Sequence, residues 1–144
     1  MHFMIIRKAD KETEAGIMPS ESLIAAMIKF NEEMVQAGVM QAGEGLHPSS
    51  KGARIKFSGG KPTIIDGPFA ETKELIAGFT MIQVESKAEA LEWVKRWPAE
   101  DAGGNVELEL RQVFAAEDFG DAFTPELRET EERLRRQAAA TAKS

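Results

Sequence analysis

The chain has 144 residues, of which 42% are hydrophobic and 29% are charged, as expected of a single globular domain. It contains no cysteine, which excludes disulfides, thiolate zinc sites and thiol chemistry. The net charge of −6 without a basic stripe argues against nucleic-acid binding, and the lack of a long apolar run or a signal-peptide pattern leads us to expect a cytoplasmic protein without a membrane segment.

The N-terminal residues predict a strand, a loop and a helix. Residues 2–7 are apolar and partly β-branched, which indicates a strand, whereas residues 8–16 are polar and indicate a loop. Residues 20–37 have apolar side chains at helical spacing, with Ser20 as the N-cap and Gly38 as the C-terminal stop. The apolar stripe of this helix comprises Leu23, Met27, Phe30 and Met34, and it is widened by Ile24, Ile28 and Val35.

The middle of the chain predicts extended structure that includes a hairpin. Residues 39–47 are spaced by glycines and indicate an extended segment. Apolar and polar side chains alternate in residues 54–58, and residues 61–66 return as the partner strand. Gly59 and Gly60 between them suit a tight turn, because glycine reaches positive φ without a Cβ clash.

Two further strands flank a second helix. Residues 77–84 predict a strong strand, and residues 106–113 predict the last strand of the core. Between them, Ser86 and Glu89 form a capping-box pattern that starts a helix, which is expected to continue to the residue before Pro98.

These elements predict an α+β fold, a ferredoxin-like sandwich with helices on one face of a mainly antiparallel sheet. We assign residues 1–115 to this domain and residues 116–144 to a C-terminal extension with a polar helix. Alternation along the last strand places Glu107, Glu109 and Arg111 on the face opposite the helices. A face that mixes apolar groups with charge fits a dimer interface enclosing a polar cavity, and it fits equally a solvated face with cross-strand ion pairs.

The sequence DGPFAETKE, from Asp66 to Glu74, carries more charge than a connection between strands requires. Its structural interpretation is a turn made by Gly67 and Pro68, in which Asp66 accepts a backbone hydrogen bond from two residues on and Phe69 anchors the loop in the core. On this interpretation the charged side chains that follow are only solvated.

The functional interpretation depends on the density of charge. Asp66 lies at a strand end and is followed closely by Glu71 and Glu74. Carboxylates held close together repel, which favours a proton on one of them and makes it a candidate general acid or base. Lys73 can neutralise the pair or bind an anionic substrate, and Arg111 can hold a substrate carboxylate by a bidentate contact.

His47, one of two histidines, precedes a proline as loop histidines often do. Histidine exchanges protons near neutral pH, so His47 becomes a proton-handling partner for Asp66 if the two side chains meet. A metal site would require His47 with Asp66, Glu71 or Glu44, and two histidines without cysteine lead us to expect no metal and no cofactor.

The motif follows the hairpin sequence GLHPSSKGARIKFSGGKP and precedes SKAEALEWVKRWP and ELRQVF. Together these stretches resemble the pattern of the YCII-related, or DGPF-domain, family over residues 1–115. The resemblance implies a ferredoxin-like fold that pairs into a dimeric α+β barrel, and it therefore favours the dimer interface over the solvated face.

The resemblance implies less about function, because most members of the family are uncharacterised. For YCII-like members, a site has been inferred from a His and an Asp in the dimer cleft. Genes of the DGPF branch often lie beside genes for extracytoplasmic-function sigma factors. The residues that match the DGPF pattern here are His47, Asp66, Gly67, Pro68, Phe69, Glu71, Lys73, Glu74 and Arg111.

We therefore predict a homodimer with a small-molecule site in the dimer cleft, where Asp66 and His47 perform acid–base chemistry of the lyase, isomerase or hydrolase type. The predicted substrate contacts are Glu71, Lys73, Glu74 and Arg111, and the predicted structural residues are Gly67, Pro68 and Phe69. Two alternatives stay open: a ligand sensor that catalyses nothing, and a protein-interaction module linked to sigma-factor regulation.

Overall fold

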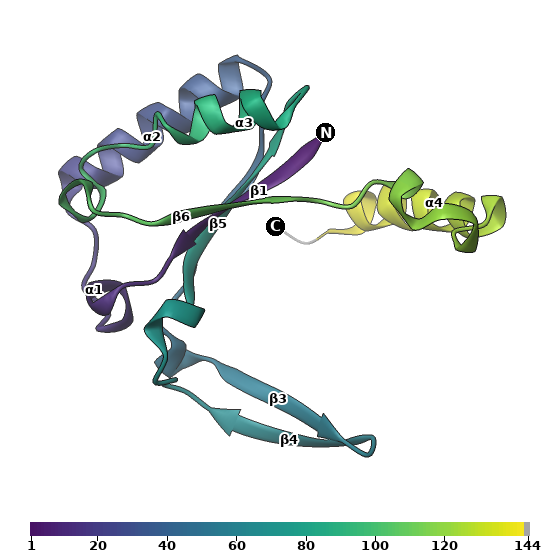
Figure 1. Cartoon of the computed structure of the whole chain (residues 1–144), viewed down its shortest axis with the longest axis horizontal. Coiled ribbons are helices and arrows are strands. Elements are labelled where there is room, and N and C mark those ends of the chain that lie inside the picture. The colour runs from purple at the N-terminus through teal and green to yellow at the C-terminus, as the bar shows by residue number, and fades with distance from the viewer. Residues whose placement is uncertain (143–144) are drawn as a thin grey trace. The chain divides into compact units, whose positions relative to one another are not determined.

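The chain folds into two compact units, one from Met1 to Val113 and a second that begins at Phe114 (Figure 1). The computed structural model describes residues 1–142. The first unit contains a four-stranded antiparallel sheet in the order β2-β5-β1-β6. Its strands are β1 (His2–Lys8), β2 (Met40–Gly45), β5 (Ile76–Gln83) and β6 (Leu108–Gln112).

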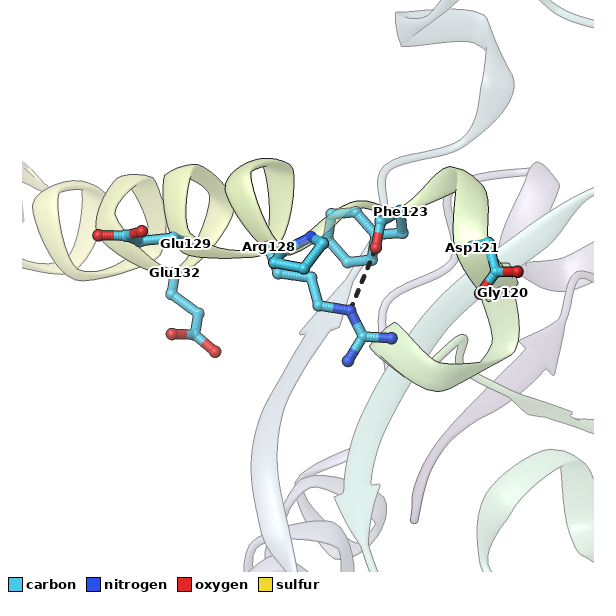
Figure 2. Close-up of a pocket in the computed structure, with 7 residues that line it drawn as sticks. Gly120, Asp121, Phe123, Arg128, Glu129 and Glu132 are labelled. Carbon is cyan, nitrogen blue, oxygen red and sulfur yellow. Dashed lines mark hydrogen bonds between the residues drawn. The ribbon is translucent and has the colours of Figure 1, made fainter.

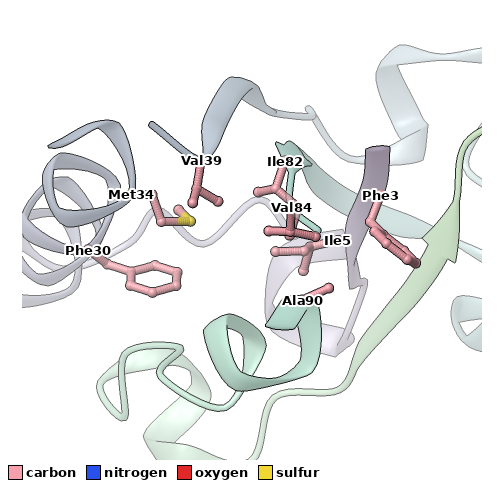
Figure 3. Close-up of a cluster of buried hydrophobic side chains, with 8 residues drawn as sticks. All are labelled: Phe3, Ile5, Phe30, Met34, Val39, Ile82, Val84 and Ala90. Atoms are coloured by element: carbon pink, nitrogen blue, oxygen red, sulfur yellow. The ribbon is translucent and has the colours of Figure 1, made fainter. Parts of the chain in front are cut away.

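Two helices, α2 (Glu21–Gln36) and α3 (Lys87–Val94), cover one face of this sheet (Figure 1). Ser20 and Ser86 cap them as predicted, because each hydroxyl accepts a hydrogen bond from the N–H three residues on. Alternate side chains of the strands pack against the helices in a single core (Figure 3). Its buried members are Phe3, Ile5, Phe30, Met34, Val39, Ile82, Val84 and Ala90. The structure thus confirms an α+β fold with a four-stranded antiparallel sheet and helices.

The predicted hairpin is confirmed and forms a sheet of its own. Strands β3 (Ala53–Ser58) and β4 (Lys61–Asp66) pair with each other and with no strand of the four-stranded sheet. Gly59 and Gly60 both have positive φ, 56° and 79°, as a two-residue turn of this kind requires. Every residue of both strands is exposed.

The second unit is helical. A 3₁₀ segment, η4 (Ala116–Ala122), precedes α4 (Pro125–Thr141), whose N-cap Thr124 accepts a hydrogen bond from the Leu127 N–H. Pro125 stands in the first helical turn, where its missing N–H costs no hydrogen bond. None of the helices in residues 1–142 combines the length and hydrophobicity needed to cross a bilayer.

Three predictions of local structure were wrong. The segment predicted as a loop contains the short helix α1 (Lys11–Glu14). The predicted second helix ends at Val94, although Trp97 still packs edge-on against Phe30 with ring centroids 5.8 Å apart. The side chains expected to widen the buried stripe of α2 are exposed, because they lie beside the stripe that faces the sheet: Ile24, Ile28 and Val35.

Candidate functional site

The DGPF motif connects the hairpin to the four-stranded sheet. Asp66 is the last residue of β4, and Gly67 and Pro68, joined by a cis peptide bond, turn the chain towards the 3₁₀ turn η2 (Thr72–Glu74) and then β5. The same end of the hairpin carries η1 (Ser49–Lys51), which leads into β3. The motif and η1 are therefore neighbours at the base of the hairpin.

Gly67 lies in very close contact with the backbone of η1. Its N–H donates to the Gly52 carbonyl over 3.0 Å. A Cβ atom at this position would lie 1.7 Å from the Ser49 carbonyl oxygen, far inside van der Waals contact. Only glycine fits here, and the reason is the close approach of two backbone segments.

Ser49 holds the motif to α1 through one acidic side chain. The Glu14 carboxylate accepts two hydrogen bonds from Ser49, one from its N–H at 3.0 Å and one from its hydroxyl at 2.6 Å. The Ser49 hydroxyl oxygen in turn accepts a hydrogen bond from the Phe69 N–H at 3.0 Å. One serine thus ties three segments together: α1, the base of the hairpin and the DGPF loop.

Helix α1 is itself fixed by its N-cap, Asp10. The Asp10 carboxylate accepts from the Thr13 N–H at 2.8 Å, and the Thr13 hydroxyl accepts from the Asp10 N–H at 2.9 Å, which completes a capping box. Arg7 of β1 donates to the other Asp10 oxygen at 3.0 Å. Burial raises the pKa of Asp10, but the hydrogen bonds from Thr13 and Arg7 and the Arg7 charge outweigh it and leave this pKa below its usual value.

The Arg7 guanidinium is held by a buried carboxylate, Asp101. It donates to both Asp101 oxygens, at 2.6 Å and 3.2 Å, and the Trp97 indole N–H donates to one of them at 2.9 Å. The Arg7 and Asp101 side chains are 11% and 7% exposed, so the pair is largely removed from solvent. Burial lowers the pKa of Arg7, but hydrogen bonds and charge from Asp101 and Asp10 raise it above its usual value, and the guanidinium stays charged.

Asp66 stands apart from this network. Its side chain is exposed and makes no hydrogen bond or ion pair with any residue in the part of the chain that the structure describes. The hydrogen bond predicted from two residues on is wrong, because that residue is Pro68, which has no N–H. The prediction that Phe69 anchors the loop in the core is also wrong: its ring is half-buried beneath the Arg54 guanidinium, 4.0 Å from the ring centroid.

The other predicted site residues are all exposed, and they fall into two regions. His47 precedes η1, and Glu71, Lys73 and Glu74 lie in or beside η2, so these four flank the base of the hairpin together with Asp66. Arg111 lies on β6 and pairs with Glu109 at 3.3 Å. Within residues 1–142, no hydrogen bond or ion pair joins Arg111 to the motif.

Arg111 belongs to the sheet face that α2 and α3 leave uncovered, here called the open face. The strand register confirms the predicted alternation, since Met4 pairs with Arg111 and Ile6 with Glu109. On the other side of β1 the same residues pair with Met81 and Phe79. The open face therefore has an apolar centre, flanked by charge: Met4, Ile6, Phe79 and Met81, with Glu44, Glu109 and Arg111.

Two surface hollows can be described, and no residue of the motif lines either of them. One, of about 530 Å³, lies in the second unit, where Arg128 reaches back to the Phe123 carbonyl (Figure 2). The other, of about 350 Å³, lies on α3 around Trp93. Among residues 1–142, no three His, Asp or Glu side chains gather closely enough to hold a metal ion.

The sequence alone pointed to the motif but missed the residues that support it. Asp10 and Thr13 show a capping pattern that could have revealed α1. Nothing in the sequence links Glu14 to Ser49, because the two residues are 35 positions apart and lie in polar segments.

Comparison with known proteins identifies the family. A model of the YCII-related domain matches residues 1–114. The chain belongs to the YCII-related family. It is also similar to an uncharacterized protein of Rhizobium meliloti (strain 1021), with 33% identity over 75 residues, which is 52% of this chain and 60% of the relative's length.

One solved structure is similar over most of the chain. It is 5-chloro-2-hydroxyhydroquinone dehydrochlorinase (TftG) from Burkholderia phenoliruptrix AC1100, in complex with 2,5-dihydroxybenzoquinone. The likeness has a TM-score of 0.40 and 20% sequence identity, and it covers 80% of this chain and 96% of the other. A likeness at this level carries no inference about activity.

The close approach at Gly67 predicts that Gly67→Ala destabilises the fold. The added methyl group forces the loop away from Ser49, so we expect the free energy of unfolding to fall by about 2 kcal/mol or more, measured by urea denaturation. Gly45→Ala is the matched control, because no atom lies within 4 Å of a Cβ built there. An equal loss of unfolding free energy in both variants would contradict the close contact between Gly67 and the Ser49 carbonyl.

The buried ion pair predicts that Asp101→Ala costs about 3 kcal/mol of unfolding free energy, because it leaves the buried Arg7 charge with only the more exposed Asp10 as its partner. Glu92→Ala, which breaks the exposed pair of Glu92 with Lys95, is expected to cost less than about 1 kcal/mol. Urea denaturation of both variants measures the difference. Similar losses would show that burial does not distinguish the two pairs.

The lowered pKa of Asp10 predicts a dependence of stability on pH. A carboxyl whose pKa is lower in the folded state stabilises the protein above its unfolded pKa, and this contribution is lost as the pH falls through the folded pKa. Asp10→Asn keeps a hydrogen-bond acceptor at the N-cap but removes the charge. We therefore expect wild type to exceed Asp10→Asn in unfolding free energy at about pH 6, with the difference shrinking below about pH 4. A difference independent of pH would contradict the role of the charge.

Proposed function

We propose that the protein is a homodimer that binds a small molecule in a cleft between two copies, where Asp66 acts as a general acid or base. The order of elements and strands supports a ferredoxin-like sandwich. Such a sheet has one face covered by helices, and the apolar centre of the open face favours burial against a second sheet. The proposed pairing is a dimeric α+β barrel.

The observation that carries the proposal is the contrast between Asp66 and the backbone that presents it. The loop is fixed by the hydrogen bonds of Gly67 and Phe69, while the Asp66 carboxylate bonds to no described residue. A general acid or base must be held in place and yet have its proton-binding oxygens free to face a substrate. The fixed backbone supports the first requirement for Asp66, and its unbonded carboxylate supports the second.

The remaining predicted residues take supporting roles in this proposal. His47 approaches the same hairpin base and is the second proton-handling group, because an imidazole can donate and accept a proton. Lys73 and Arg111 supply positive charge for an anionic group of the ligand, with Glu71 and Glu74 as acceptors for its hydroxyl groups. A small carboxylic acid is the ligand class that fits this set.

A second candidate function is a protein-interaction module linked to sigma-factor regulation. It is supported by the second unit, where four large apolar side chains are about half exposed or more: Phe114, Phe119, Leu127 and Leu134. Exposed apolar side chains gathered on one small unit are typical of surfaces that bind another protein. The ligand-sensing alternative uses the same cleft as the enzyme but predicts binding without turnover.

The proposal predicts that Asp66→Asn removes function without harming the fold. Because the carboxylate has no partner among the described residues, we expect the unfolding free energy to change by less than about 0.5 kcal/mol. A panel of small mono- and dicarboxylic acids is screened by thermal shift against wild type. Any acid that stabilises wild type is then expected to lose its effect on Asp66→Asn.

Glu100→Gln is the control, because it removes an exposed carboxylate far along the chain from the motif. A loss above about 1.5 kcal/mol in Asp66→Asn would show that the charge serves the fold. An acid that stabilises Asp66→Asn as strongly as wild type would place the site elsewhere. NMR spectroscopy of the incubated acid, which detects isomerisation as well as bond cleavage, separates the enzyme, which converts it, from the sensor, which returns it unchanged.

A further inference from the structure

The β3–β4 hairpin has two chemically different faces. The pairing of Ile55 with Ile64 and of Phe57 with Pro62 puts these four side chains on one face, here called the apolar face of the hairpin. Ile55, Phe57 and Ile64 are 55%, 66% and 69% exposed. The opposite face carries basic side chains, Arg54, Lys56 and Lys61.

A hairpin of this kind is not expected to stand alone in water. Two strands without a third strand or a helix to pack against are marginally stable at best. The base of the hairpin is nonetheless held firmly, by the hydrogen bonds of Gly67 to Gly52 and of Phe69 to Ser49. We therefore expect the apolar face of this firmly anchored hairpin to pack against another surface.

The charge of the hairpin indicates which surface covers its apolar face. Residues 51–66 carry four basic side chains and one carboxylate, a net charge of +3, whereas the whole chain carries −6. The rest of the chain therefore sums to −9, and two such bodies repel each other. A basic hairpin is complementary to the acidic body of a second copy, and contact between them offsets that repulsion.

We propose that the hairpin is an intersubunit arm, whose apolar face packs on a second copy of this chain in addition to the contact between the two open faces. A two-fold axis makes the exchange mutual, so both arms are covered and the assembly closes as a dimer. Because Asp66 and Gly67 form the base of the arm, the exchange places the DGPF loop at the border between the two copies.

This inference rests on the homodimer of the proposed function and adds the arm to it. The chain has no cysteine, so a single introduced thiol reports on one position only. Ile64→Cys places the thiol on the apolar face of the hairpin. Ile65→Cys places it at the next residue of the same strand, which points to the opposite face. Sedimentation equilibrium first locates the monomer–dimer transition, and iodoacetamide labelling is then followed at concentrations on both sides of it.

The thiol of Ile64→Cys is expected to react at least about tenfold more slowly in the dimer than in the monomer, while the thiol of Ile65→Cys changes by less than about twofold. Equal labelling of Ile64→Cys in monomer and dimer would overturn the arm while leaving the dimer and the Asp66 site standing. Equal protection of both thiols would overturn the assignment of the covered face. A chain that stays monomeric at every concentration would overturn the arm and the proposed dimer together.

A charge placed on either face gives a second, independent readout. Ile64→Lys and Ile65→Lys make the same chemical change on opposite faces of one strand. We expect Ile64→Lys to raise the dimer dissociation constant at least about tenfold and Ile65→Lys to change it by less than about threefold, because only the first lysine would have to be buried. Dimerisation of Ile64→Lys as tight as that of wild type would overturn the arm.

Discussion

The geometry of the motif depends on one carboxylate, that of Glu14, which accepts both hydrogen bonds that Ser49 can donate. Charge-assisted hydrogen bonds are stronger than neutral ones, and here two of them converge on a single residue. The Ser49 hydroxyl oxygen is thereby oriented to accept from the Phe69 N–H, and the Ser49 carbonyl comes so close to Gly67 that no side chain fits between them. Glu14 is the last residue of the short helix α1. Arg7 of β1 holds this helix through its N-cap Asp10, and Arg7 is itself held by the buried Asp101.

The motif therefore separates into a structural part and an exposed part. Gly67 and the Phe69 N–H serve the fold through contacts that involve the backbone. The side chains of Asp66, Glu71, Lys73 and Glu74 make no hydrogen bond or ion pair within residues 1–142, although they lie on the same fixed loop. These side chains lie near the hairpin base, and none of them lines either of the two hollows. Membership of the YCII-related family, an uncovered sheet face and an uncovered hairpin face all favour completion of the site by a second copy.

Much of the fold could be predicted because it depends on local patterns. The spacing of Phe30 and Met34 marked the buried side of α2, and Gly59 and Gly60 marked the hairpin turn. The same local reasoning failed where neighbouring segments decide the outcome. Ile24, Ile28 and Val35 have the composition of a buried stripe, but they are exposed because the helix turns the neighbouring stripe to the sheet. Phe69 looked like a core residue, but it packs under Arg54 of the hairpin instead.

The sequence by itself determined the α+β class, the order of the strands and longer helices without α1, the two-faced hairpin and the position of the DGPF motif. Periodicity, caps and turn residues act within a few positions of one another, which is why they could be recognised. Only the tertiary structure decided what each residue of the motif does. Glu14 and Ser49 are 35 positions apart, and Arg7 and Asp101 are 94 apart, so no local pattern could connect them. Hydrogen bonds between such distant residues form only after the chain has folded, and within residues 1–142 they leave the carboxylates of Asp66, Glu71 and Glu74 unbonded.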